Sequence, residues 1–247
     1  MKYVLSVYRG VPGNQYWEDF ELVMRPSENI ISALMEIQKN PINKEGKKVT
    51  PIVWEQGCLE EVCGSCSMLV NGRPMQACVG LIHHLLDKDN RITIAPLSKF
   101  PLVRDLICDR QVMFDSLKKV RAYVDVDKCI DRGPGRKVSQ NEQEVMYALS
   151  TCMTCGCCSE ACPQINEKSE FIGPAPLSQV RLFQIYKPNG KRLEPLMDKG
   201  GVADCGNAQN CVRVCPKNIP LTESIAVIGR DVTMRAVWKF FGLPESE

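Results

Sequence analysis

The sequence lacks several features that mark common functional classes. Its net charge of +2 over 247 residues is nearly neutral, which gives no argument for nucleic-acid binding. No apolar run is long enough to cross a bilayer, and the N-terminus has no three-part cleavable signal. We therefore expect a reducing, cytoplasmic setting, although a partner could still hold the chain at a membrane.

Sites for organic substrates are also missing. Gly133-Pro134-Gly135 is too short and too proline-bound to be a glycine loop that cradles a dinucleotide. We find no nucleophile paired with a base. The two histidines, His83 and His84, are interpreted as surface residues of a helix rather than as proton carriers or ligands. Any organic substrate is therefore expected to bind a partner subunit.

Cysteine, in contrast, is abundant, with 14 in the chain. An apolar content of 44% is typical of a globular protein that builds its own core, so disulfide staples are not needed. In a reducing compartment the thiols are available to bind metal. Their spacing places most of them in three motifs.

The first part of the chain predicts a small α+β domain over residues 1–101. A hairpin, a helix ending before Asn40-Pro41, a polar connector at 42–57 and a turn at Asn71-Gly72 support this interpretation. The predicted elements are strands over 2–8, 16–24, 67–70, 74–79 and 91–96, and a helix over 29–39.

The second part, residues 102–247, predicts a mostly helical domain interrupted by cysteine loops. Helices are predicted over 102–124, 141–149, 176–186 and 222–241, with a loop over 127–137. The last helix carries an apolar stripe that we expect to pack in the core: Ile225, Ile228, Val232, Ala236 and Phe240, together with Val237 and Phe241. The alternative for its end, Trp238-Lys239-Phe240-Phe241, is contact with a membrane surface.

The first cysteine motif has the plant-type ferredoxin spacing C-x4-C-x2-C with a distant fourth cysteine. Its members are Cys58, Cys63, Cys66 and Cys78. Gly57 and Gly64 allow the loop to bend closely around a metal. Four thiolates without a histidine predict a [2Fe-2S] cluster rather than a Rieske centre, and a zinc site is the alternative.

The other two motifs are half-sites of the bacterial ferredoxin type, C-x2-C-x2-C-x3-C-P. The first has five cysteines in eleven residues, and its spacing selects Cys152, Cys155, Cys158 and Cys162. The second has Cys205, Cys211 and Cys215, with Ala208 in place of a cysteine.

In paired half-sites the fourth cysteine of each motif binds the cluster of the other. Cys152, Cys155, Cys158 and Cys215 therefore predict a [4Fe-4S] cluster. Cys162, Cys205 and Cys211 leave one corner to the apolar Ala208, which predicts a [3Fe-4S] cluster. Zinc sites or disulfides would not explain the repeated spacing. Cys108, Cys129 and Cys157 are expected to be thiols that bind no metal.

These motifs together resemble the iron–sulfur subunit of succinate dehydrogenase and fumarate reductase, over essentially the whole chain. Further stretches that are similar to this family are Cys58–Cys66, Phe100–Leu106, Phe171–Ala175 and Cys215–Lys217. The resemblance implies an N-terminal β-grasp domain of the plant-type ferredoxin kind and an all-helical, bacterial-ferredoxin-like second domain.

The resemblance also implies partners. It implies a flavoprotein subunit with covalent FAD, where succinate and fumarate interconvert, and a cytochrome b membrane anchor with haem b and a quinone. The chain would pass electrons between them at the cytoplasmic face of the bacterial inner membrane. In the family [2Fe-2S] faces the flavin, [4Fe-4S] lies in the middle and [3Fe-4S] faces the membrane.

Two details concern the quinone. The stretches Ser32–Glu36 and Cys205–Cys211 are most similar to bacterial members that work with a di-haem anchor and menaquinone. Ubiquinone-reducing members have a Trp shortly after the first Cys-Pro and a His after the first cysteine of the second half-site. Here Gln164–Glu167 follows Cys-Pro and Gly206 follows Cys205, so that quinone pocket is not transferred.

Other functions remain open at this stage. A fumarate reductase would use the same three clusters in the opposite direction. A free-standing multi-cluster ferredoxin is another alternative, but this chain is larger than a simple electron carrier needs. Related reductases that take electrons from thiols append further cysteine-rich domains, and this sequence ends at Glu247 without one.

Overall fold

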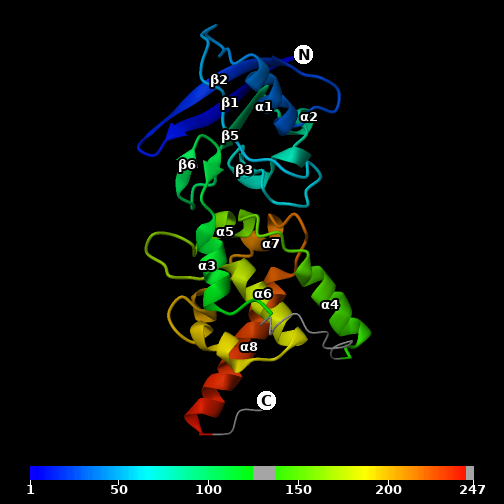
Figure 1. The fold of residues 1–247 in the computed structure, drawn as a ribbon, viewed down its shortest axis with the longest axis vertical. Helices are drawn as coiled ribbons and strands as arrows, with labels where there is room; N and C mark the ends of the chain where they lie inside the picture. The colour runs from blue at the N-terminus through cyan, green and yellow to red at the C-terminus, as the bar shows by residue number, and fades with distance from the viewer. Residues whose placement is uncertain (125–136, 243–247) are drawn as a thin grey trace. The chain divides into compact units, whose positions relative to one another are not determined.

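The computed structural model describes residues 1–124 and 137–242, and the chain divides into two units (Figure 1). Unit 1 consists of Met1–Arg110 and Met153–Ala161, and unit 2 of Gln111–Cys152 and Cys162–Glu247. Cys129 and the loop predicted over 127–137, as far as residue 136, lie outside the described residues. In the described ranges no helix has the length and apolarity to span a bilayer.

Unit 1 is built on a five-stranded mixed sheet with the order β2-β1-β5-β3-β4. The strands are β1 (Lys2–Val11), β2 (Asn14–Val23), β3 (Ser67–Val70), β4 (Arg73–Gln76) and β5 (Arg91–Ala95). β1 runs antiparallel to β2 and parallel to β5. The five predicted strands are confirmed, although the first hairpin turn is tighter than the predicted loop because Val11 pairs with Asn14.

Helix α1 (Ile30–Lys39) contributes an apolar face to the core of unit 1. Its start is held by a capping box, in which Asn29 accepts the N–H of Ser32 and Ser32 Oγ accepts the N–H of Asn29. Asn29 Nδ2 also donates to the carbonyl of Cys78 at 2.9 Å. One cap residue therefore ties the helix start to the segment of the fourth cysteine.

The short helix α2 (Ile82–Leu85) follows a 3-10 turn, η1 (Ala77–Val79). Ile82 is buried, whereas His83 and His84 are exposed on α2, which confirms them as surface residues of a helix. The end of the strand predicted over 74–79 is this 3-10 turn instead, so Cys78 lies on a turn that returns from the sheet.

The helix predicted over 102–124 is wrong in its first part. β6 (Leu102–Arg104) and β7 (Ile107–Cys108) form a two-stranded sheet there, and α3 covers only Gln111–Lys119. Asp105 turns the chain with a left-handed φ of 47°. Its carboxylate accepts the N–H groups of Gly10 and Val53, each at 2.9 Å. These tertiary contacts outweigh the helical spacing of the neighbouring apolar residues.

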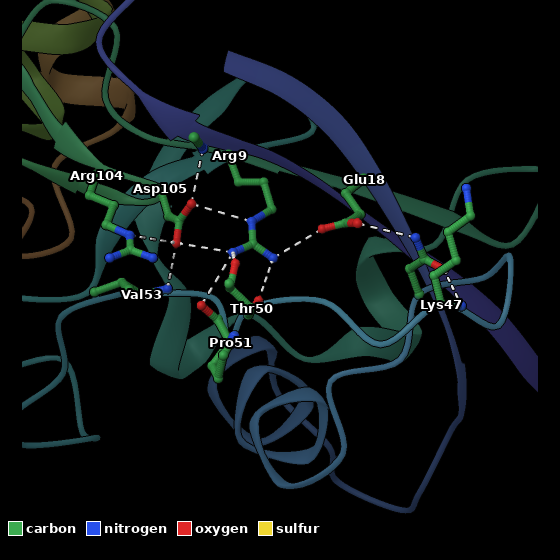
Figure 2. Close-up of polar contacts among 10 residues, drawn as sticks. Arg9, Glu18, Lys47, Thr50, Pro51, Val53, Arg104 and Asp105 are labelled. Atoms are coloured by element: carbon green, nitrogen blue, oxygen red, sulfur yellow. Dashed lines mark hydrogen bonds and ion pairs between the residues drawn. The ribbon is translucent and has the colours of Figure 1, made fainter. Parts of the chain in front are cut away.

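A buried ionic cluster joins this hairpin to the sheet (Figure 2). Arg9 is 1% exposed and pairs with Glu18 at 3.0 Å and with Asp105 at 3.3 Å. Arg9 also donates to the carbonyls of Thr50 and Pro51 at 2.8 and 3.2 Å. Because a buried cation needs such partners, the cluster fixes the 50–53 segment, which leads into the Cys58 loop.

Helix α5 (Cys157–Ala161) belongs to unit 1, although it comes late in the sequence. Its Glu160 accepts the hydroxyl of Ser98 at 2.5 Å and the N–H of Lys99 at 3.0 Å. These bonds hold α5, which carries Cys157 and Cys158, against the Ser98–Lys99 segment within unit 1.

Unit 2 is helical and centred on α6 (Pro174–Tyr186) and α8 (Leu221–Phe240). The remaining α-helices here are α3, α4 (Gln140–Ser150) and α7 (Asn210–Arg213). Leu177, Val180, Ile225 and Ile228 meet in its core. The helices predicted over 141–149, 176–186 and 222–241 are confirmed to within two residues.

The apolar stripe of α8 is buried only in its first part. Ile225, Ile228 and Val232 are in the core, but Ala236 and Phe240 are exposed, as are Val237 and Phe241. The expectation that the whole stripe packs inward is wrong, because the core ends near Arg235. There the buried guanidinium pairs with Glu194 at 2.9 Å instead.

Candidate functional site

The loop after Gly57 directs backbone N–H groups at sulfur. Cys58 Sγ accepts the N–H groups of Glu60, Val62 and Cys63 at 3.5, 3.2 and 3.3 Å. The loop reaches this shape through left-handed backbone at Leu59 and Glu61, with φ of 62° and 59°. Three converging N–H groups can donate to a metal-bound sulfur, so this arrangement suits a cysteine ligand.

Cys63 has a similar environment. Its Sγ accepts the N–H groups of Cys58 and Ser65 at 3.4 and 3.5 Å. These bonds, the one from Cys58 first, lower the pKa of Cys63 to about 6. A Cβ at Gly57 would lie 3.0 Å from the same sulfur. The close approach expected at Gly57 is therefore present.

Cys66 and Cys78, by contrast, are buried. Burial raises the pKa of the Cys66 thiol to about 12, and Cys78 lies close enough to contribute. Coordination to a metal deprotonates such a thiol outright. Of the predicted [2Fe-2S] ligands, Cys58 and Cys63 are at least partly exposed, whereas Cys66 and Cys78 are buried. The chemistry of these four thiols fits an iron–sulfur cluster.

The part of the second motif that belongs to unit 1 lies directly against the first motif. A Cβ at Gly64 would lie 2.9 Å from the Cβ of Cys155, and the φ of Gly64 is +74°. Arg110 donates to the carbonyls of Gly64 at 2.7 Å and Cys155 at 3.4 Å. Gly64 therefore permits a close approach of the two cysteine loops, and Arg110 ties their backbones together.

Cys157 is fully buried beside these loops. The pKa of Cys155 is lowered to about 7, chiefly by a hydrogen bond with the Cys157 side chain. The same interaction, with burial, raises the pKa of Cys157. The structure therefore favours the Cys155 side chain as the thiolate of this pair.

In unit 2 three cysteines line one pocket. They are Cys162, Cys205 and Cys211, and Ala208 lines the same pocket together with Phe171 and Ile225. Burial, and then the neighbouring Cys162 and Cys205, raise the pKa of Cys211. The set predicted for [3Fe-4S] is thus brought together, with a methyl group where a fourth thiolate would stand.

The set predicted for [4Fe-4S] is divided between the units. Cys155 and Cys158 belong to unit 1, and Cys152 and Cys215 to unit 2. Cys215 Sγ accepts the N–H of Ile219 at 3.4 Å, which again supplies a backbone donor to a sulfur. This set remains a prediction.

The described cysteines also bear on the alternatives of disulfide bonds and zinc sites. None of the thirteen described cysteines is in a disulfide bond. Within the described part of the chain, no three His, Cys, Asp or Glu side chains are grouped to hold a single metal ion.

Two family models match the chain. A 2Fe-2S iron-sulfur cluster binding domain matches residues 4–115, and a 4Fe-4S dicluster domain matches residues 148–219. The chain is 51% identical to the succinate dehydrogenase iron-sulfur subunit of Bacillus subtilis, over 98% of this chain and 96% of that protein. The chain belongs to this family. It is an iron–sulfur electron-transfer subunit of succinate dehydrogenase and part of that complex.

More distant members are also similar. The fumarate reductase iron-sulfur subunit of Wolinella succinogenes is 33% identical, over 70% of this chain and 74% of that protein. A chain of the Mycobacterium smegmatis Sdh1 complex has the same fold, with a TM-score of 0.82 and 22% identity over 95% of this chain and 96% of that chain. The predicted fold class, β-grasp domain then helical dicluster domain, is confirmed.

Sequence spacing did not indicate the residues that join the cysteine loops. Arg110 and the buried Gln76, which contacts both Cys66 and Cys157, follow no motif of their own. The one sequence signal for Gln76 is that a polar side chain stands among the apolar residues before Cys78.

Proposed function

We propose that three clusters in this chain carry electrons between the FAD of a flavoprotein subunit and a membrane quinone. The proposed ligands are Cys58, Cys63, Cys66 and Cys78 for [2Fe-2S], Cys152, Cys155, Cys158 and Cys215 for [4Fe-4S], and Cys162, Cys205 and Cys211 for [3Fe-4S]. The observation that carries the three-iron assignment is the pocket that collects three thiols and Ala208.

The clusters, when bound, supply one-electron carriers. The residues of this chain hold them and set their surroundings. Backbone N–H groups face Cys58 and Cys63, and the close packing at Gly64 brings two cysteine loops together within unit 1. Burial of Cys66, Cys78 and Cys211 keeps water from part of each proposed cluster site.

We also propose that the sequence forms two domains. The first covers residues 1–101 and the second residues 102–247.

The proposed direction is succinate oxidation. The 51% identity to a subunit named for succinate dehydrogenase favours it over fumarate reduction, for which the named Wolinella relative is 33% identical. We propose menaquinone as the electron partner and a di-haem cytochrome b anchor, because Gly206 follows Cys205 where ubiquinone-reducing relatives have a histidine.

We further propose a peripheral position at the cytoplasmic face of the bacterial inner membrane, held by the anchor subunit. The exposed end of α8 supports a contact of this kind. Phe240 and Phe241 are 84% and 66% exposed, and Trp238 and Val237 lie beside them. Solvated aromatic side chains gathered at one helix end mark an interaction surface.

Purification of the intact complex from membranes tests these proposals. We expect co-purification of a flavoprotein and a haem-containing anchor, with menaquinone as the extracted quinone. Electron paramagnetic resonance (EPR) spectra should contain the signals of an oxidised three-iron cluster and a reduced [2Fe-2S] cluster. A native mass equal to that of a monomer, with no flavin, would instead support a free-standing ferredoxin.

A further inference from the structure

A buried glutamine connects the two cysteine motifs of unit 1. Gln76, the last residue of β4, is 1% exposed. Its Oε1 lies 3.6 Å from Cys66 Sγ, and its Nε2 donates to Ser67 Oγ at 2.8 Å and to Cys157 Sγ at 3.5 Å. One amide therefore contacts a proposed [2Fe-2S] ligand and the buried thiol beside Cys158.

The hairpin does not need this amide for its own pairing. Ser67 and Gln76 face each other in the β3–β4 ladder, whose backbone bonds do not depend on the side chain. An apolar side chain would fill the site without the cost of burying a primary amide, about 1–3 kcal/mol when its bonds are not made. All three contacts of the amide are with a cysteine sulfur or with Ser67 beside the cysteine loop, which indicates that the amide serves the cysteine loops rather than the hairpin.

Ser67 extends the same chain of contacts. Its hydroxyl donates to the carbonyl of Gly64 at 2.8 Å, in the loop between Cys63 and Cys66. Gly64 is also the residue that packs against Cys155. The amide of Gln76, the hydroxyl of Ser67 and the thiol of Cys157 therefore form one buried polar group between the two loops.

We propose that Gln76 is a positioning residue that donates an amide N–H to the Cys66 thiolate and raises the reduction potential of the [2Fe-2S] cluster. The proposal rests on the proposed assignment of Cys66 as a ligand. An iron-bound thiolate can only accept a hydrogen bond, so the amide turns its Nε2 toward Cys66 when the cluster is present. Its Oε1 then faces Ser67 Oγ, whose single O–H turns from the Gly64 carbonyl to the amide, while Arg110 still donates to that carbonyl. The Cys157 thiol on the same side can likewise donate to the amide in place of Cys155.

The effect on potential follows from charge. The cluster gains one electron and no proton on reduction, so its sulfurs become more negative. A donor bond to a ligand sulfur stabilises the reduced state more than the oxidised state. Gln76 therefore favours reduction of [2Fe-2S], and Cys157 acts through the amide by holding its orientation.

Redox titration of the membrane-bound complex, monitored by EPR, tests this inference. We expect Gln76→Leu to retain the [2Fe-2S] signal but lower the reduced-to-oxidised ratio about tenfold at fixed ambient potential, a shift of about 59 mV for one electron. Cys157→Ala should give a smaller shift in the same direction and retain the [4Fe-4S] signal. Cys157→Ser keeps a donor and should restore the ratio to within about twofold of wild type.

Two matched variants serve as controls. Gln56→Leu removes an exposed glutamine two residues before Cys58, whose amide oxygen accepts from Trp54 Nε1. Cys108→Ala removes a buried thiol from β7, outside both loops. Neither should change the ratio more than about twofold. An intact [2Fe-2S] signal with an unchanged potential in Gln76→Leu would overturn the inference, whereas absence of the signal from wild type would overturn the ligand assignment.

A second measurement does not require that the Gln76→Leu complex assembles. Pulsed EPR of the reduced wild-type complex, labelled with ¹⁵N in glutamine side-chain amides, should detect a ¹⁵N nucleus coupled to the [2Fe-2S] spin. The coupling should persist in Gln56→Leu. Absence of any side-chain ¹⁵N coupling, or its loss in Gln56→Leu, would contradict an amide donor from Gln76.

Discussion

The loop from Cys58 to Cys66 and the loop from Cys205 to Cys211 surround their sulfur atoms in different ways. In the loop from Cys58 to Cys66, backbone N–H groups face two sulfurs, and the pKa of Cys63 falls to about 6. In the loop from Cys205 to Cys211, Cys211 is buried, and this burial raises its pKa. The first loop thus stabilises negative sulfur at Cys63 before any metal binds, whereas the buried Cys66 and Cys211 would lose their protons to a metal.

Both loops use left-handed backbone, and the first does so at Leu59 and Glu61 as well as at a glycine. The first has a glycine at its tightest contact, Gly64. The second has Asn207 and Gln209 with φ of 51° and 60°, on either side of Ala208. The comparison indicates that the first loop is shaped by close packing against a neighbouring loop, whereas the bend around Ala208 depends on two residues that are not glycine.

The largest expected effect is a change of cluster type in the second loop. Ala208→Cys should supply a fourth thiolate, so the EPR signal of the oxidised three-iron cluster is lost and that of a reduced four-iron cluster appears. Ala208 is exposed, so a larger side chain can be accommodated.

Ala208→Val is the matched control, because it adds bulk without a ligand and should retain the three-iron signal. An unchanged three-iron signal in Ala208→Cys would contradict the assignment of Cys162, Cys205 and Cys211.

The next effect concerns the support of the first loop. Arg9→Met leaves Glu18 and Asp105 buried without their cation, which should cost about 3–5 kcal/mol. On heating the complex, the [2Fe-2S] signal should then be lost well before the three-iron signal.

Lys2→Met, which removes an exposed pair with Glu21, should cost at most about 1 kcal/mol and change neither signal. Simultaneous loss of both signals in Arg9→Met would show that the ionic cluster does not act on the first loop in particular.

A smaller effect is expected at Gly64. Gly64→Ala combines left-handed strain with a clash against Cys155 Cβ at 2.9 Å and Met153 O at 3.0 Å. We expect a destabilisation of about 1–3 kcal/mol, measured as earlier thermal loss of the [2Fe-2S] signal.

Gly72→Ala provides the control, because Gly72 has a φ of +75° with nothing within 4 Å of an added Cβ. It should cost about 1 kcal/mol from strain alone. Equal losses at the two glycines would remove the argument for close packing between the loops.

The smallest effect is a gain in the second loop. Gln209→Gly relieves left-handed strain and should raise the thermal stability of the three-iron signal by about 0.5 kcal/mol, after the entropy cost of glycine. Gln209→Ala keeps the strain and should give no gain. A loss of stability in Gln209→Gly would mean that the side chain itself supports the loop.

Cysteine spacing predicted a [2Fe-2S] domain followed by a dicluster domain, because thiolate ligands must stand at short, regular intervals around a compact cluster. The hairpin, α1 and α8 were predicted because their apolar periodicity matches their burial. The order of the sheet strands was not predictable from local pattern, since β5 pairs with β1 across more than eighty residues.

The missed features depend on contacts between distant residues. The β6–β7 hairpin was mistaken for a helix because Leu102 and Leu106 have helical spacing, while the Arg9–Asp105 pair that decides the turn spans 96 residues. Phe240 and Phe241 were expected in the core because they continue the apolar stripe of α8, but the core ends before them. The role of Gln76 likewise required the position of Cys157.

Unit 1 is discontinuous in the sequence, and this has a consequence for biosynthesis. Residues 153–161 complete it, yet the ribosome makes residues 111–152 of unit 2 first. A nascent chain that ends at Arg110 has Gln76 without Cys157 and Ser98 without Glu160. The N-terminal domain therefore cannot reach its final state before residue 161 has left the exit tunnel. Delivery of iron and sulfide to its first loop then either precedes that moment, into an incomplete site, or waits until residue 161 has been made.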